Sequence, residues 1–132
     1  MDCIFCKIAV GEIPSIKIWE DENFVAILDI NPNRRGVTLV ISKKHYGSDF
    51  SELPAEVASR FTEASQKVAK LIKVGLGVDR VIMVAEGLGV DHAHFKLYPC
   101  YKDGEGHLST NLGPQATTEE LQRVASDILS RA

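Results

Sequence analysis

The length, composition and charge of the chain narrow the possible classes of protein. With 132 residues, 45% of them hydrophobic and 25% charged, residues 1–132 have the size and balance of a single globular domain. A formal net charge of −3 argues against nucleic acid as the main partner, and the lack of a long apolar run or a secretory signal predicts a cytoplasmic protein with no membrane span.

The first part of the chain predicts a short helix followed by three strands. Residues 3–10 are expected to form one or two helical turns, which a Gly-Glu-Ile-Pro segment ends. The alternation over 16–19 and the apolar run over 24–30 predict two strands joined in a hairpin. After a loop over 31–36, residues 37–42 return as a third strand.

A long amphipathic helix is predicted next. Apolar residues recur every three or four positions from 53 to 72, which is the stripe of a helix that buries one face. Ser51 is expected to cap its start, and the Gly-Leu-Gly segment at 75–77 is expected to end it.

The last part of the chain predicts two strands and a second main helix. The strands cover 80–85 and 94–98, and Thr117 with Glu120 forms a capping box that opens the final helix. Consecutive short strands with one helix among them favour an α+β fold over a parallel sheet. We therefore expect an antiparallel sheet of about five strands with two main helices.

The segment 90–99 carries the highest density of reactive side chains. His92, His94 and Lys96 alternate with apolar residues, so on a strand they would share one face at spacings of about 6.5–7 Å. Such a face suits an anion, because a neutral imidazole held by a backbone acceptor can attack phosphorus beside a cation. The same spacing also fits the polar outer face of a half-exposed strand. Spacing alone does not separate these two interpretations.

Two of the three cysteines stand close together near the start of the sequence. Cys3 and Cys6 have the spacing of a metal-binding pair, which His45 and His92 could complete as a Cys2His2 tetrahedron. A redox pair is disfavoured because no strand precedes the cysteines, and two buried thiols at a helix start are the other alternative. Three cysteines are too few for a disulfide framework and indicate a reducing compartment. His107 lies in a glycine-rich stretch and is predicted to be a solvated loop residue.

Five short segments follow one another in a distinctive order. They are Cys3-Ile4-Phe5-Cys6-Lys7-Ile8, Gly11-Glu12-Ile13-Pro14, Ile27-Leu28-Asp29-Ile30, Gly36-Val37-Thr38-Leu39-Val40-Ile41-Ser42-Lys43-Lys44-His45 and Val90-Asp91-His92-Ala93-His94. With all five in register, the chain resembles the histidine triad family of nucleotide-binding hydrolases from about Cys3 to Pro99. The resemblance implies a HIT-like antiparallel sheet with two helices and a two-fold homodimer. It also implies hydrolysis or transfer at the α-phosphate of nucleotide conjugates, such as dinucleoside polyphosphates or adenylyl phosphoramidates.

The resemblance implies roles in nucleotide chemistry for individual residues. The central histidine of the triad corresponds to His94, which would attack phosphorus and carry a nucleotidyl-histidine intermediate. Asp29 corresponds to the residue that binds ribose hydroxyls. Phe5, Ile8 and Ile27 correspond to apolar residues that sandwich the base, and ordinary core packing is the alternative for Ile8 and Ile27.

The resemblance also implies a zinc site. In zinc-bearing bacterial members of the family the ligands correspond to Cys3, Cys6, His45 and His92, and all four residues are present. Their joint presence favours zinc more strongly than the spacing of the two cysteines does. Because four protein ligands leave no open coordination position, the implied zinc is structural.

The chain departs from the family pattern around the phosphate site. The third histidine of the triad is replaced by Lys96, and the histidine that usually follows the loop glycine is replaced by Val37. A polar Gln-Ser pair before the first triad histidine appears as Leu88-Gly89. Lys96 still supplies positive charge, although as a flexible ammonium rather than an oriented ring. We therefore expect altered phosphate handling, with Lys96 offsetting phosphoryl charge beside His94.

Three functional hypotheses follow. The first is an enzyme, a nucleotide hydrolase or nucleotidyl transferase in which His94 is the nucleophile and Lys96 stabilises charge. The second is a zinc-stabilised nucleotide-binding module with little or no turnover, which the replacements at Val37 and Lys96 favour. The third is a purely structural zinc-bound dimer. The retained His94 favours the enzyme, because a module that only binds nucleotides does not need a nucleophile.

Overall fold

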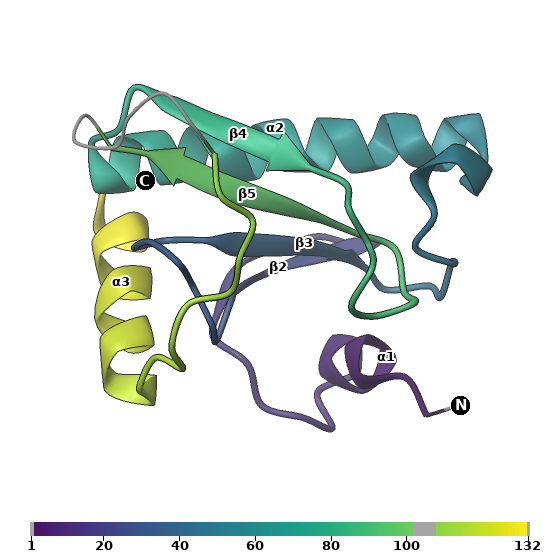
Figure 1. Cartoon of the computed structure of the whole chain (residues 1–132), viewed down its shortest axis with the longest axis horizontal. Coiled ribbons are helices and arrows are strands. Elements are labelled where there is room, and N and C mark those ends of the chain that lie inside the picture. Colours follow the sequence, from purple (N-terminus) through teal and green to yellow (C-terminus); the bar gives the residue numbers. More distant parts are fainter. Residues whose placement is uncertain (1, 102–107, 132) are drawn as a thin grey trace.

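The computed structural model describes residues 2–101 and 108–131, and in these ranges the chain forms five strands and three α-helices. In chain order the elements are α1 (Ile4–Ala9), β1 (Lys17–Glu20), β2 (Phe24–Leu28), β3 (Thr38–Ser42), the 3₁₀ helix η1 (Phe50–Glu52), α2 (Ala55–Leu76), β4 (Arg80–Val84), β5 (His94–Cys100) and α3 (Thr118–Ser130). The predicted α+β class, with about five strands and two main helices, is confirmed (Figure 1).

The five strands form one antiparallel sheet in the order β1-β2-β3-β5-β4. The last strand in sequence, β5, therefore lies between β3 and β4. Its partners on β3 are Ile41 for His94 and Leu39 for Lys96. Because β5 is bonded on both sides, the backbone that carries His94 and Lys96 is held inside the sheet rather than at an edge.

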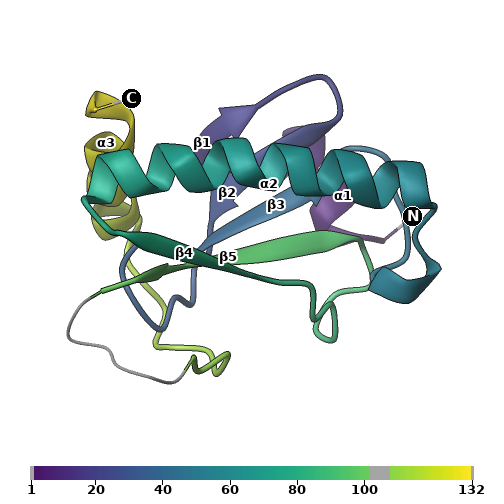
Figure 2. The ribbon, with the colours of Figure 1, turned by 90° about the horizontal axis from the view of Figure 1, so that it is seen from above.

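One face of the sheet is covered by α2, which lies along it (Figure 2). Phe61 of α2 stacks on Phe95 of β5 with the ring centres 4.6 Å apart, and Phe24 of β2 meets Phe61 edge-on at 4.7 Å. The residues that alternate with His94 and Lys96 point into this core, as predicted, and these are Ala93, Phe95 and Leu97. The opposite face of β5 is therefore free for polar side chains.

The other face of β2 and β3 is covered by α1. Phe5 of α1 packs with Val25 and Ile27 of β2 and with Leu39 and Ile41 of β3. Since helices cover both faces, every residue of β2 and β3 is buried, which explains the continuous apolar runs in the sequence. The same packing brings α1 to the face of the sheet that carries His94 and Lys96.

The start of α2 differs from the prediction that Ser51 caps it. Ser51 lies inside η1, where the Asp49 carboxylate accepts its main-chain N–H at 3.0 Å. The helix begins two residues later than expected, at Ala55, directly after Pro54 and without a side-chain cap. Asp49 therefore takes the capping role one turn earlier, and Pro54, whose ring fixes its φ angle, sets the helix start.

The far end of α2 falls in the predicted Gly-Leu-Gly segment, as expected. The helix continues through Gly75 to Leu76 and ends at Gly77, whose φ of 66° is the left-handed conformation of a helix C-cap. A side chain at Gly75 would collide with the backbone of Ile128 in α3, so this glycine allows the two helices to cross closely. Over the described residues no helix has both the length and the apolarity needed to cross a bilayer.

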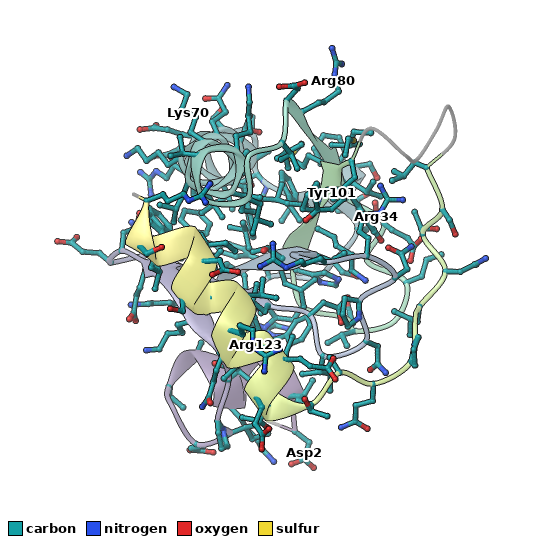
Figure 3. The ribbon with its side chains drawn as sticks, turned by 90° about the vertical axis from the view of Figure 1, so that its left-hand side faces the viewer. Asp2, Arg34, Lys70, Arg80, Tyr101 and Arg123 are labelled. Atoms are coloured by element: carbon teal, nitrogen blue, oxygen red, sulfur yellow. The ribbon has the colours of Figure 1, made fainter. Side chains whose placement is uncertain are left out.

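The C-terminal helix α3 begins with the predicted cap. The Thr117 hydroxyl accepts the main-chain N–H of Glu120 at 3.1 Å, and the helix then packs on the end of α2 and on β1. Figure 3 shows α3 in front of the sheet, with Arg123 on it and α2 seen along its axis. The segment before α3 pairs with the loop after β2, because Ala116 donates its N–H to the Ile30 carbonyl at 2.8 Å.

One strand boundary on the site face also differs from the prediction. The strand expected over 24–30 ends at Leu28, because the Asp29 carboxylate accepts the N–H of Asn31 at 2.8 Å and turns the chain. The strand that carries His94 and Lys96 begins at His94, as predicted, so His92 lies in the bend before it and does not share the strand face. His92 therefore points to a different set of neighbours from those of His94 and Lys96.

Candidate active site and metal centre

The four residues expected to bind a metal lie together at the start of α1. One donor atom from each of Cys3, Cys6, His45 and His92 falls within 4.8 Å of all the others. The Nδ1 atom of His92 lies 3.2 Å from Sγ of Cys3, 3.4 Å from Sγ of Cys6 and 3.1 Å from Nδ1 of His45. The structure thus brings together residues from α1, from the segment after β3 and from the segment before β5.

These donors fit zinc. In a zinc tetrahedron with Zn–S near 2.3 Å and Zn–N near 2.0 Å, neighbouring ligand atoms are about 3.3–3.8 Å apart, close to the separations found between these side chains. Two thiolates and two imidazoles are also the donor set that zinc prefers. Burial raises the pKa of the Cys6 thiol, so a metal ion bound here would displace a proton and would supply the charge that stabilises the thiolate.

Hydrogen bonds orient His92 for this role. Its Nε2 lies 2.6 Å from the carbonyl oxygen of Ser42, so Nε2–H donates to that oxygen and leaves the lone pair of Nδ1 facing the cysteines. Burial lowers the pKa of His92, which keeps the imidazole neutral. The next segment is also anchored, because the Asp91 carboxylate accepts the N–H of Ser48 at 2.9 Å. The Ser48 N–H lowers the pKa of Asp91 and keeps it ionised.

A backbone hydrogen bond orients the His94 imidazole. Its Nδ1 lies 2.7 Å from the carbonyl oxygen of His92, a distance at which Nδ1–H donates and Nε2 is left with a free lone pair. Burial lowers the pKa of His94 and the charge of Lys96 lowers it further, which favours the neutral, nucleophilic imidazole. The Phe5 ring meets that of His94 edge-on with the centres 5.0 Å apart, so α1 holds one side of the imidazole.

A cavity of about 390 Å³ opens in front of His94. Its apolar wall includes the three residues expected to sandwich a base, which are Phe5, Ile8 and Ile27. Phe5 and Ile27 belong to the core cluster under α1 and Ile8 packs against it, so these residues line the cavity and pack the core at the same time. The polar wall holds Asp29, His94 and Lys96. The structure therefore brings every predicted nucleotide-site residue to one cavity of a size suited to a small ligand.

Lys96 does not extend freely into this cavity. Its Nζ lies 3.0 Å from Oδ2 of Asp29, and the two side chains are only 20% and 10% exposed. Nζ also lies 5.9 Å from the centre of the Tyr98 ring, within the range of a cation–π contact. The sequence suggests a flexible ammonium at this position, whereas the structure has an ammonium fixed between a carboxylate and an aromatic ring.

The other two departures from the family pattern have different consequences. Val37 is buried and does not line the cavity, so no polar side chain replaces the missing imidazole there. Leu88 is exposed and also lies outside the cavity lining, whereas Gly89 is part of it. Of the four histidines, His107 lies outside the residues that the structure describes, so its predicted loop position is not addressed.

Some residues that line the cavity are not predicted from the sequence. Tyr98 follows Lys96 by two positions on β5, and continuing the strand alternation from His94 would have placed it on the same face. Glu86 comes from the loop after β4, and Thr110 and Leu112 come from the segment before α3. No sequence signal marks those three, because the chain folds them over the cavity from irregular segments.

The comparisons with known proteins identify the family of the chain. The HIT domain family model matches residues 10–103. An uncharacterized HIT-like protein of Methanocaldococcus jannaschii is 43% identical over 109 residues, which are 78% of this chain and 83% of that protein. The chain therefore belongs to the histidine triad, or HIT, family.

Other relatives are named for an activity or a bound metal. An adenosine 5'-monophosphoramidase of Saccharomyces cerevisiae is 30% identical over 98% of this chain and 82% of that protein. An adenylylsulfatase of Arabidopsis thaliana is 33% identical over 74% of this chain and 52% of that protein. A solved structure of a Zn-bound histidine triad family protein from Mycobacterium smegmatis has a TM-score of 0.77 at 30% identity, covering 99% of this chain and 93% of that one.

Proposed function

We propose that this protein is a nucleotide hydrolase or nucleotidyl transferase that acts at the α-phosphate of nucleotide conjugates. The observation that carries the proposal is His94, a neutral imidazole whose Nδ1–H is held by the His92 carbonyl while Nε2 is free for attack in the cavity. The family supports nucleotide chemistry in general, and the relatives named as a phosphoramidase and an adenylylsulfatase support adenylyl conjugates in particular.

The proposed reaction has two steps. Nε2 of His94 attacks the α-phosphorus, the bond from phosphorus to the leaving group breaks, and the leaving group departs with the electron pair. Water, or another acceptor in a transfer reaction, then attacks the same phosphorus and breaks its bond to Nε2. Lys96 stabilises negative charge on the phosphoryl oxygens in both steps, while the apolar wall with Phe5, Ile8 and Ile27 holds the base. Asp29 accepts hydrogen bonds from the ribose.

A substrate panel tests the proposal. The purified protein is incubated with adenosine 5'-phosphoramidate, adenylyl sulfate and diadenosine polyphosphates, and the products are separated by ion-exchange chromatography. We expect release of AMP from at least one adenylyl conjugate. The specific alternative is a nucleotide-binding module without turnover, which is favoured by the buried Val37 where the family has an imidazole. Tight AMP binding without any product from the panel would establish that alternative.

Loss of the Lys96 charge should affect rate more than binding. For Lys96→Met we expect the activation free energy to rise by about 2–4 kcal/mol, the usual cost of removing one donor from a developing oxyanion. The effect should appear in kcat, with a smaller change in the affinity for AMP. Lys96→His restores the family residue and should raise activity only if the cavity can orient the ring. Equal losses of kcat and AMP affinity in Lys96→Met would instead assign Lys96 to binding.

Structural zinc is part of the proposal. Cys3, Cys6, His45 and His92 would hold the ion, whose charge would stabilise the two thiolates and fix α1 to the sheet. With four protein ligands it has no position for substrate, so none of the chemical steps passes through it. The Zn-bound relative from Mycobacterium smegmatis supports this assignment.

We also propose a two-fold homodimer formed along β4. Among the described strands β1 and β4 are the two edges of the sheet, and β4 carries the exposed Met83 between Ile82 and Val84. Sedimentation should give a mass of about 29 kDa, twice the 14.5 kDa of the chain. Met83→Asp should shift the mass toward the monomer, because like charges would meet across the axis. The control Val10→Asp changes another exposed apolar residue and should stay dimeric. A wild-type monomer at micromolar concentration would contradict the proposal.

A further inference from the structure

The ion pair between Lys96 and Asp29 joins two parts of the cavity that have separate roles in the proposed function. Lys96 lies on β5 two positions after His94, on the side where phosphate would bind. Asp29 follows β2, on the side where ribose would bind. The 3.0 Å contact between Nζ and Oδ2 crosses β3, which lies between these two strands in the sheet.

We propose that Asp29 is a positioning residue for Lys96, in addition to any contact it makes with ribose. The Asp29 carboxylate holds the ammonium of Lys96 beside His94, so a flexible side chain acts as an oriented donor toward the phosphoryl group. The inference rests on the proposed function, because it concerns how the same site handles the phosphate. It explains how a lysine can stand where the family has a histidine ring.

The number of donors and acceptors allows this arrangement. An ammonium has three N–H donors, and the contact with Asp29 uses one, which leaves two for phosphoryl oxygens. A carboxylate has about four acceptor positions. Oδ1 of Asp29 already accepts the N–H of Asn31 at 2.8 Å, and Oδ2 accepts from Lys96. Free positions therefore remain on both groups, so Lys96 and Asp29 can stay paired while ribose and phosphate bind.

Burial strengthens the ion pair between Lys96 and Asp29. Both side chains are mostly shielded from solvent, so their attraction is screened less than that of a surface pair. Asp29 is itself fixed, since the N–H of Asn31 holds its other oxygen. The Tyr98 ring, 5.9 Å from Nζ, limits the movement of the ammonium on another side. Removing the carboxylate charge would free Nζ, and a displacement of about 1 Å at a reacting centre costs on the order of 100-fold in rate.

A substrate without ribose hydroxyls separates the two roles of Asp29. Asp29→Asn keeps an acceptor for the Asn31 N–H but removes the charge that pairs with Lys96. On 2',3'-dideoxyadenosine 5'-phosphoramidate the ribose contact is absent from the start, so any loss of kcat in this variant reports the position of Lys96. We expect a fall of roughly ten- to one-hundredfold. In the Lys96→Met background, Asp29→Asn should cause no further fall.

A matched control is available at another turn. Asp21 also accepts the N–H of the residue two positions later, Asn23, at 2.8 Å, and it lies outside the cavity. Asp21→Asn changes the net charge and the local hydrogen bond in the same way and should leave kcat unchanged. The binding of 2',3'-dideoxyadenosine 5'-monophosphate is measured by calorimetry with the same variants. This measurement tests the coupling between Asp29 and Lys96 without requiring turnover.

The outcomes distinguish this inference from the proposed function. If the wild type hydrolyses the dideoxy substrate and Asp29→Asn does so equally well, Asp29 does not position Lys96, while the proposed function stands. The inference is also overturned if Asp29→Asn lowers kcat by the same factor in the wild type and in the Lys96→Met background. If the wild type binds the dideoxy nucleotide but hydrolyses no conjugate, the proposed enzyme fails. The inference is then decided by whether Asp29→Asn weakens binding only when Lys96 is present. A chain that binds no nucleotide overturns both.

Discussion

His94→Ala is expected to abolish turnover of every nucleotide conjugate while AMP binding remains largely intact. In the proposed mechanism His94 supplies the atom that attacks phosphorus, whereas base and ribose would contact Phe5, Ile27 and Asp29. Loss of a covalent nucleophile costs on the order of 10⁴-fold or more in kcat. No second imidazole can substitute within the described part of the chain, because His45 and His92 belong to the metal cluster.

Two measurements make this expectation specific. Rapid acid-free denaturation of the wild type during turnover of a labelled adenylyl conjugate should trap label on the protein, and His94→Ala should trap none. His107→Ala removes the histidine that lies outside the family motifs and serves as the control, with wild-type turnover expected. Calorimetry with AMP shows whether the variant still binds. If His94→Ala hydrolyses the conjugates at the wild-type rate, His94 is not the nucleophile.

Loss of the metal is expected to have the largest effect on stability. Structural zinc contributes about 10–16 kcal/mol of apparent binding free energy in small metal-binding domains, comparable to the whole free energy of unfolding of a typical domain. We expect about one zinc per chain after purification without added metal. Cys6→Ser, or treatment with a strong chelator, should remove it. Even a loss of 3 kcal/mol would lower Tm by about 10 °C for a chain of this size.

The third cysteine provides the matched control for this experiment. Cys100 lies at the end of β5, outside the metal cluster, and its thiol contacts only the carbonyl of Tyr98 at 3.8 Å among the hydrogen bonds of the described residues. Cys100→Ser should therefore keep both the zinc content and the Tm of the wild type. A metal content near zero in the wild type, or a Tm that Cys6→Ser leaves unchanged, would contradict structural zinc at this cluster.

The metal cluster could be predicted from the sequence, whereas the ion pair of Lys96 and Asp29 could not. The spacing of Cys3 and Cys6 fits a metal-binding pair but also other roles, and the family resemblance favours zinc because His45 and His92 are present with them. The ion pair depends on the strand order β2-β3-β5 and on the direction of a long side chain across β3. Neither property has a local sequence signal, so the sequence predicts a flexible ammonium at Lys96 and not its pairing with Asp29.

The boundaries of α2 show a second limit of sequence reasoning. Its apolar stripe was clear because a repeat of three to four residues reports burial of one helix face. The start of the helix depends on two local features. The Asp49 carboxylate accepts the N–H of Ser51, so Ser51 does not cap α2, and Pro54 directly precedes the first turn. At Gly75 a side chain would collide with the backbone of Ile128, a contact with a distant part of the chain that has no local sequence signal. Element type was therefore easier to predict than element ends.

The position of α1 links the Cys/His cluster to the cavity that we propose binds nucleotide. The helix has six residues, too few to be stable alone in water, where helices of about 12–15 residues are still marginal. Cys6 belongs to the Cys/His cluster, while Phe5 and Ile8 line the cavity. If an ion that holds α1 in place tightens nucleotide binding by some factor, thermodynamic reciprocity requires that nucleotide tighten metal binding by the same factor. A cell that keeps the cavity filled would then also protect the protein from losing its metal.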